Sequence, residues 1–198
     1  MAQTSSFSDV PNKRLDEELE ELDNHLMSET LKSMKYASGT KFTFLNDIAF
    51  QRECLECHNM IRERHGCPPL NWCQSLASEA ELWAQEILRK GRLLYRDRNG
   101  FGENLLLADV EDASRLPSGS AVTKFWSDEM VHYNYDKPGW SEKCQNFTQM
   151  IWKGSKEFGV SRLSSFKTRK VVVVAFYHPA GNLNEKNDYR INVPPPLN

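Results

Sequence analysis

The sequence feature that most limits the fold is an uninterrupted run of β-branched, small and aromatic residues, Val171 to Tyr177. Charged residues precede this run, and Pro179 and Gly181 follow it. A strand with one face in water alternates apolar and polar residues, whereas this run has no charged or amide side chain. We therefore predict a strand buried on both faces, which requires a layer of other structure on each side of its sheet.

Helices with apolar stripes are predicted upstream of that strand and can form those layers. Spacings of three and four residues place two sets of side chains on helical faces: Phe50, Cys54, Cys57 and Ile61, and then Leu76, Ala80, Trp83 and Ile87. A third helix is expected from Phe147 to Lys153. We therefore expect an α+β fold whose sheet is covered on both sides.

A change of composition divides the chain into two parts. Its 198 residues suit one core with an extension. We predict a polar, acidic extension over residues 1–46 and a domain over 47–198. Four leucines, separated by acidic residues, predict an amphipathic helix in the extension: Leu15, Leu19, Leu22 and Leu26. That helix either packs on its own domain or frays in solvent, or it recruits a partner or pairs two copies as a homodimer.

The charge balance and the N-terminal segment exclude several classes of protein. Because 25 basic and 27 acidic residues give a net charge of -2, we expect no nucleic-acid partner. The first residues lack the pattern of a secretory signal, and the longest apolar run is far shorter than the roughly 20 residues of a transmembrane helix. Ala2 excludes myristoylation at this position. We expect a cytoplasmic protein with no transmembrane segment.

Five cysteines cannot all pair within one chain, and because the sequence lacks the pattern of a secretory signal we expect reduced thiols. Cys54 to His58 spells C-x-x-C-H, the pattern of covalent haem attachment. Both of its cysteines also belong to an apolar helical stripe, where free cysteine acts as a small hydrophobic residue. Cys67 and Cys73 do not form a second C-x-x-C pair for zinc. We predict neither haem nor a cysteine zinc site.

Five motifs in order resemble the CAP family (cysteine-rich secretory, antigen 5 and pathogenesis-related proteins). They are His58-Asn59 with Arg62, His65-Gly66 and Pro68-Pro69-Leu70, GENL at Gly102–Leu105, WSDEMVHYNY at Trp126–Tyr135, NFTQMIWKGSKEFG at Asn146–Gly159, and YHPAGN at Tyr177–Asn182. The resemblance extends from about residue 48 to the end. It implies a three-layer α-β-α sandwich with a central, mainly antiparallel sheet.

Two further positions indicate a branch of this family. The tail from Asn192 to Pro196 is most similar to the intracellular, Golgi-associated branch. Secreted members usually have a cysteine where this chain has Ala175. The resemblance therefore implies a cytoplasmic protein, peripheral to the Golgi or other internal membranes.

The resemblance also implies a large cleft in which two histidines and two glutamates can bind a divalent metal. Glu103 and Glu129 match the two glutamates. Asn146 occupies the position of one histidine, and Tyr95, with Arg96 the next candidate, occupies that of the other. Since two carboxylates without imidazole hold an ion weakly, we predict no metal and no cofactor.

Two interpretations of the glutamates stay open. Glu103 and Glu129 could act as a general acid and base in a protease-like hydrolase if burial separated their pKa values. No nucleophile accompanies them, because Ser127 and Asp128 point away from Glu129 on a helix. The alternative is structural: Glu103 ties a loop and Glu129 forms hydrogen bonds across the cleft.

Tyr133, Tyr135 and Trp140 have the aromatic spacing proposed for caveolin contact in this family. Such residues either line the core and the cleft or contact a sterol, a lipid or a membrane protein through their amphipathic rings. The leading prediction is a non-enzymatic CAP protein that binds lipids, sterols or protein partners through its cleft. The rivals are a hydrolase using Glu103 and Glu129, and a scaffold working through the acidic helix.

Overall fold

The computed structural model of the chain describes residues 41–96, 100–110, 116–165 and 167–197. The helices and strands in chain order are α2 (Lys41–Arg64), β1 (Asn71–Trp72), α3 (Gln74–Lys90), β2 (Gly102–Asp109), α4 (Gly119–Ser127), η2 (Asp128–His132), η3 (Glu142–Cys144), α5 (Gln145–Met150), β3 (Glu157–Ser165), β4 (Lys170–His178) and α6 (Asp188–Asn192). Within these residues, no helix has the length and apolarity needed to cross a bilayer.

The predicted doubly buried strand is confirmed as β4. The sheet order is β1-β3-β4-β2, and β4 is antiparallel to both of its neighbours, while the short β1 is parallel to β3. Every residue from Val171 to Tyr177 is 0% exposed. A strand that is hydrogen-bonded on both edges and covered on both faces has no position for a polar side chain that meets water, which explains its composition.

One face of the sheet is covered by α3. Alternate β4 residues pack in one cluster with the apolar stripe of that helix: Val172, Val174 and Phe176 with Leu76, Ala80, Ala84 and Ile87. The helix comes unusually close at Gly159 of β3, where an added Cβ would lie 2.3 Å from the backbone nitrogen of Ala77. The stripe predicted for this helix is therefore confirmed, and it faces the sheet.

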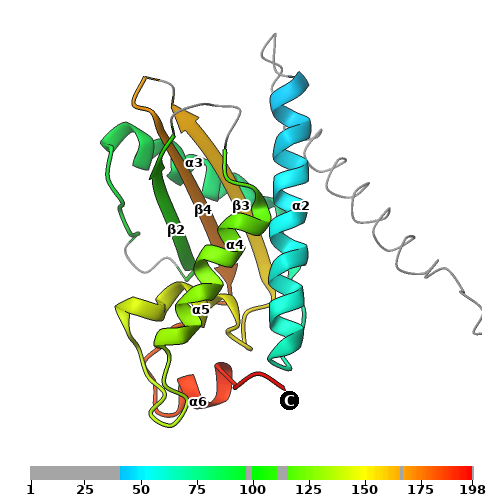
Figure 1. Ribbon diagram of the computed structural model, residues 1–198, viewed down its shortest axis with the longest axis vertical. Helices are drawn as coiled ribbons and strands as arrows, with labels where there is room; N and C mark the ends of the chain where they lie inside the picture. The colour runs from blue at the N-terminus through cyan, green and yellow to red at the C-terminus, as the bar shows by residue number, and fades with distance from the viewer. Residues whose placement is uncertain (1–40, 97–99, 111–115, 166, 198) are drawn as a thin grey trace, which may run out of the picture. The chain divides into compact units, whose positions relative to one another are not determined.

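The opposite face is covered by α2, α4 and α5, as Figure 1 shows. His58 of α2 and Tyr177 of β4 meet there, with 5.9 Å between their ring centroids. Together with α3 on the other face, these helices complete the three-layer α-β-α sandwich that the family resemblance implied.

Arg62, at the C-terminal end of α2, ties that helix to distant loops. Its guanidinium is 0% exposed and donates hydrogen bonds to four backbone carbonyl oxygens. The acceptors are Pro68 at 2.8 Å, Met150 and Trp152 at 2.9 Å each, and Ser155 at 3.0 Å. A guanidinium has five N–H donors in a rigid fork, so one side chain can donate to several loop carbonyls. Arg62 therefore holds the C-terminal end of α2 against the loops that contain these four acceptors.

Some boundaries differ from the expected ones. The helix expected over Phe147–Lys153 is α5, which begins at Gln145 and ends at Met150. In the stripe expected for α2, Phe50 and Cys54 are buried, whereas Cys57 and Ile61 are only partly covered. Helix α2 begins before the boundary predicted near Asn46. The leucine-rich helix predicted for the extension lies outside the described residues, so it stays a prediction.

Candidate functional site

Four elements carry the side chains that the sequence pointed to. Tyr95 lies in the loop after α3, Glu103 is in β2, Glu129 is in η2, and Asn146 is in the first turn of α5. The α2 and α4 helices pack beside this region, and α5 contacts both β2 and η2. The cleft residues therefore come from segments up to about fifty positions apart, brought together at the β2 edge of the sheet.

Glu129 is bound to the N-terminal end of α5. Its Oε2 accepts hydrogen bonds from the backbone N–H groups of Asn146 and Phe147, at 2.9 and 3.2 Å, and its Oε1 accepts one from the Asn146 side-chain amide at 2.6 Å. The first N–H groups of a helix lack intrahelical acceptors, and a carboxylate there also suits the helix dipole. Glu129 therefore caps α5.

Glu103 has a different environment. Its Oε2 accepts a hydrogen bond from the backbone N–H of Arg96 at 3.3 Å. This bond attaches the loop before β2 to the strand. Burial raises the pKa of Glu103 to about 7, although the Arg96 N–H and the Arg96 charge oppose that rise. Burial likewise raises the pKa of Glu129, against the hydrogen bonds from Asn146 and Phe147. A carboxyl with a pKa near 7 can exist in either protonation state at neutral pH.

The two carboxylates are not paired with each other. Glu103 is in register with Phe176 and so lies on the α3 side of the sheet, whereas Asn104, which points to the other side, donates to the Asn146 carbonyl at 3.0 Å. Neither carboxylate is among the groups that shift the pKa of the other. The geometry therefore offers two separate acids at one edge of the sheet.

Tyr95 lies near enough to both acids for their charges to act on its hydroxyl. Its hydroxyl accepts a hydrogen bond from the Gln145 side-chain amide at 3.2 Å, and its side chain is largely exposed. Burial of the hydroxyl raises the pKa of Tyr95 first, and the charges of Glu103 and Glu129 raise it further. Tyr95 therefore belongs to the same region as both carboxylates.

Arg96 is directed toward α3 and away from the other cleft residues. It forms an ion pair with Glu79 at 3.0 Å, and its guanidinium lies over the rings of Trp83 and Phe176, at 4.9 and 5.3 Å from their centroids. Its side chain therefore fastens the loop to α3, while its backbone N–H serves Glu103.

A buried polar chain behind the cleft was not predicted from the sequence. Asn104 donates from Nδ2 to the Tyr177 hydroxyl at 3.1 Å, and that hydroxyl lies 2.8 Å from His58 Nε2. His58 Nδ1 lies 2.6 Å from the Cys54 carbonyl, which can only accept, so Nδ1 carries the proton and Tyr177 donates to Nε2. Burial lowers the pKa of His58 to about 3, which keeps the ring neutral. All three side chains belong to the sequence motifs, but the motifs do not indicate that His58, Asn104 and Tyr177 contact one another.

The same chain accounts for the C-x-x-C-H pattern. Both ring nitrogens of His58 have partners inside the protein, and Cys54 is 0% exposed in the core. Cys54 and His58 are therefore explained by the packing of α2 against β4.

The three aromatic residues singled out for lipid or partner contact have different positions. Tyr133 is 8% exposed and packs edge-on against Tyr135 at 4.9 Å and Phe147 at 6.2 Å. Trp140 is 55% exposed. Tyr133 therefore lies in the core, which is one of the two alternatives given for these residues, because its ring packs toward α5; Trp140 is the exposed member.

The residues of the cleft do not fit a zinc ion. Zinc sites use thiolate, imidazole or carboxylate ligands in a tetrahedral arrangement. Glu129 already accepts three N–H donors, and the Asn146 amide donates to it. In the described part of the chain, no group of three or more His, Cys, Asp or Glu side chains is placed to hold a metal ion.

Comparisons with known proteins agree with the fold and the motifs. Residues 55–177 match the CAP model, described as the cysteine-rich secretory protein family. The chain is 36% identical over 151 residues to the Golgi-associated plant pathogenesis-related protein 1 of Homo sapiens, covering 74% of this chain and 94% of that protein. It is 28% identical to pathogenesis-related protein 1 of Arabidopsis thaliana, covering 70% and 82%.

Solved structures show the same fold. The venom allergen-like protein 4 of Schistosoma mansoni superposes with a TM-score of 0.52 at 23% identity, covering 74% of this chain and 95% of that one. The structure described as NaASP2 with Zn²⁺ gives 0.56 at 18% identity, covering 71% and 85%. The chain belongs to the CAP family.

Proposed function

We propose that this CAP domain works by binding an amphiphilic lipid or sterol, without catalysis and without a bound metal. The observation that carries the non-catalytic part is the capping of α5 by Glu129, because both of its carboxylate oxygens are occupied by N–H donors of Asn146 and Phe147. A carboxylate held by these hydrogen bonds stabilises the helix terminus and has little freedom to transfer protons. The family relationship supports a binding protein, and the name of the Golgi-associated human relative supports a location at the Golgi.

A groove between α2 and α4 supports the binding part. It has a volume of about 480 Å³ and is lined by apolar or small side chains that include Met60, Ile61 and Ala121. Arg64 and Lys124 also line it, and Lys124 pairs with Asp128 at 2.6 Å. Because Asp128 also lines the groove and pairs with Lys124, Arg64 supplies the cation at its border, and apolar walls beside that cation suit an acyl chain or sterol that carries an anionic or hydroxyl head.

A binding experiment tests the groove. Titration of the full chain with a fluorescent fatty acid should give saturable binding, and Met60→Glu should weaken it about tenfold or more, because the bound acyl chain would cover the new charge and remove it from water. Leu82→Glu is the matched control, since Leu82 of α3 is 56% exposed and Met60 is 51% exposed. Equal loss in both variants, or no saturable binding by the parent, would rule out the groove as the lipid site.

Metal analysis tests the degenerate cleft. The purified protein should hold much less than one equivalent of zinc after dialysis. The double variant Tyr95→His, Asn146→His restores both imidazoles of the family site and should raise zinc content relative to the parent. A full equivalent retained by the parent would contradict the proposal.

The pKa of Glu103, raised to about 7 by burial, favours one alternative: a hydrolase in which Glu103 transfers a proton. Peptide and ester substrates should show no turnover above background if the binding function holds. Were turnover found in the parent and lost in a folded Glu103→Gln variant, the enzyme would be established.

The scaffold alternative concerns the acidic segment with Leu15 and Leu26. Deletion of residues 1–40, followed by mass measurement in solution, distinguishes a homodimer formed by that segment from a monomer. A dimer that persists after deletion would place the contact on the CAP domain.

A further inference from the structure

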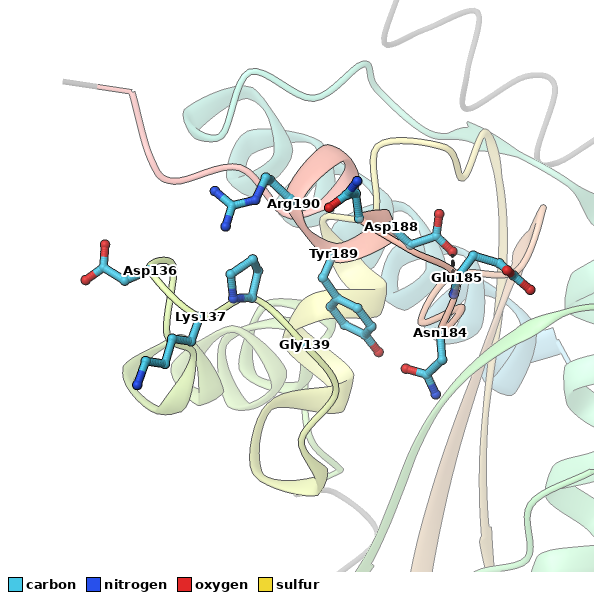
Figure 2. Close-up of a pocket in the computed structure, with 10 residues that line it drawn as sticks. Asp136, Lys137, Gly139, Asn184, Glu185, Asp188, Tyr189 and Arg190 are labelled. Atoms are coloured by element: carbon cyan, nitrogen blue, oxygen red, sulfur yellow. Dashed lines mark hydrogen bonds between the residues drawn. The ribbon is translucent and has the colours of Figure 1, made fainter.

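A second pocket lies apart from the residues of the cleft. It has a volume of about 340 Å³ and is formed by the loop at 136–139 and the segment at 184–190, with Tyr189 of α6 between them (Figure 2). Neither Glu103 nor Glu129 lines it. This volume is at the small end of the range for ligand pockets, so it suits a small polar molecule.

The lining of this pocket is dominated by charged and amide side chains. Its acids are Asp136, Glu185 and Asp188, its cations are Lys137 and Arg190, and its amides are Asn184 and Asn187. Within the described residues, none of the five charged side chains forms an ion pair with another. Two hydrogen bonds join Glu185 and Asp188 and hold the turn: the Glu185 N–H donates to Asp188 Oδ2 at 3.1 Å, and the Asp188 N–H donates to the Glu185 carbonyl at 3.2 Å. The opposite charges therefore share a pocket without neutralising one another.

The charges are also separated in space. In Figure 2, Lys137 and Arg190 lie on one side of Tyr189, and Glu185 and Asp188 lie on the other. Asp136 is on the side of the cations. Two cations and one carboxylate therefore lie on one side of Tyr189, and two carboxylates lie on the other, so a ligand with an anion at one end and an ammonium at the other can lie across Tyr189 with each end near opposite charge.

Tyr189 gives the pocket a fixed aromatic wall. Its side chain is 5% exposed, and its ring packs edge-on against Trp152 with 5.2 Å between centroids. Its hydroxyl is buried and has no hydrogen-bond partner among the described residues. Burial raises the pKa of Tyr189, so the hydroxyl keeps its proton as an unused donor beside the pocket. An aromatic ring beside carboxylates is a favourable surface for an ammonium group.

We propose that this pocket binds a small zwitterion of the phosphoethanolamine type, with its phosphate toward Lys137 and Arg190 and its ammonium toward Glu185 and Asp188. A phosphate oxygen cluster can accept from both cations at once, and an ammonium with three donors can serve two carboxylates. The inference rests on this pocket alone. It does not depend on the lipid groove between α2 and α4, so either can fail without the other.

The test is a titration of the full chain with phosphoethanolamine, followed by calorimetry and by amide chemical shifts. Saturable binding is expected, with shifts concentrated at 136–139 and 184–190. Inorganic phosphate and ethanolamine, each tested separately, should bind at least tenfold more weakly, because each engages one wall only. Equal binding of inorganic phosphate would overturn the zwitterion assignment, and so would the absence of saturable binding.

Variants test the two walls separately. Arg190→Gln and Glu185→Gln should each weaken binding about tenfold, the loss expected for one charge-assisted hydrogen bond. Lys186→Gln is the matched control, because Lys186 is exposed next to Glu185 but does not line the pocket. Unchanged affinity in both wall variants would overturn the proposal, as would an equal loss in the control.

Vesicles distinguish the source of the headgroup. If the ligand is a lipid, vesicles containing phosphatidylethanolamine should retain the chain, and soluble phosphoethanolamine should compete it off. If the ligand is a free metabolite, the soluble compound binds and the vesicles do not retain the chain. Both results support the headgroup chemistry, whereas retention that phosphoethanolamine fails to displace would contradict it.

Discussion

Glu129 binds Asn146 twice, accepting its backbone N–H at 2.9 Å and its side-chain amide at 2.6 Å. Asn146 occupies the position at which the family resemblance implies a metal-binding histidine. An amide there donates to the neighbouring carboxylate, whereas an imidazole ligand and that carboxylate would both direct lone pairs at a metal. The pair therefore converts two potential metal ligands into one helix cap.

Replacement of Glu129 by Gln should destabilise the domain by about 1–3 kcal/mol, because one acceptor oxygen becomes an NH₂ group facing the N–H donors of α5. Urea unfolding of parent and variant measures the difference. The neighbouring Asp128→Asn is the control: its ion pair with Lys124 is exposed, so its loss should change stability by less than about 0.5 kcal/mol. Similar effects of both substitutions would contradict the capping role.

Glu103 should make stability fall as pH rises. Its folded pKa of about 7 exceeds the ordinary value of 4.5, so between these pH values the folded protein binds more protons than the unfolded chain. That difference gives a negative slope of unfolding free energy against pH. The Glu103→Gln variant lacks the titration, so the stability of the variant relative to the parent should increase from pH 4.5 to pH 7.

After allowance for solvent screening, the Glu103 effect should be on the order of 1 kcal/mol. His58 acts in the opposite direction, because its folded pKa of about 3 lies below the ordinary 6.5 and stability is lost as pH falls below that value. The comparison of parent and variant cancels this contribution. A difference that stays constant across the range would show that Glu103 titrates normally.

Arg62→Met should be strongly destabilising, by about 3–5 kcal/mol, because four buried carbonyl oxygens lose their donor. Chemical denaturation provides the measurement. Arg64→Met is the control, since Arg64 is exposed on the same helix, and a change below about 1 kcal/mol is expected there. A small effect at Arg62 would mean that the loops do not depend on its guanidinium.

Gly159→Ala should also destabilise the domain, because the new Cβ would lie 2.3 Å from the Ala77 backbone nitrogen and 2.6 Å from the Leu76 carbonyl carbon. Separating α3 from the sheet opens the core, at a cost of about 1–3 kcal/mol. Gly139→Ala has nothing within 4 Å of its Cβ and should change the melting temperature little. Equal melting temperatures for both variants would show that α3 can shift without loss.

The main elements could be predicted because their signals are local. The composition of Val171–Tyr177 is sufficient to indicate β4 as a central strand, and the spacing of Leu76, Ala80 and Ile87 identifies the face of α3 that meets it. The ordered motifs similarly identified the family, because their spacing along the chain is itself the signal. The end of α5 at Met150 was not predicted, since a helix of six residues depends on its caps more than on periodicity.

The sequence by itself determined the layered fold, which follows from residue types at fixed spacings, and the family resemblance of its motifs implied that Asn146 stands where a histidine is usual. Only the tertiary structure decided that Glu129 caps α5, that Arg62 donates to four loop carbonyls, and that charged side chains of both signs gather around Tyr189. These relationships join side chains and backbone groups that are far apart in the chain. Their geometry depends on how whole helices and loops pack, which no local pattern of residues encodes.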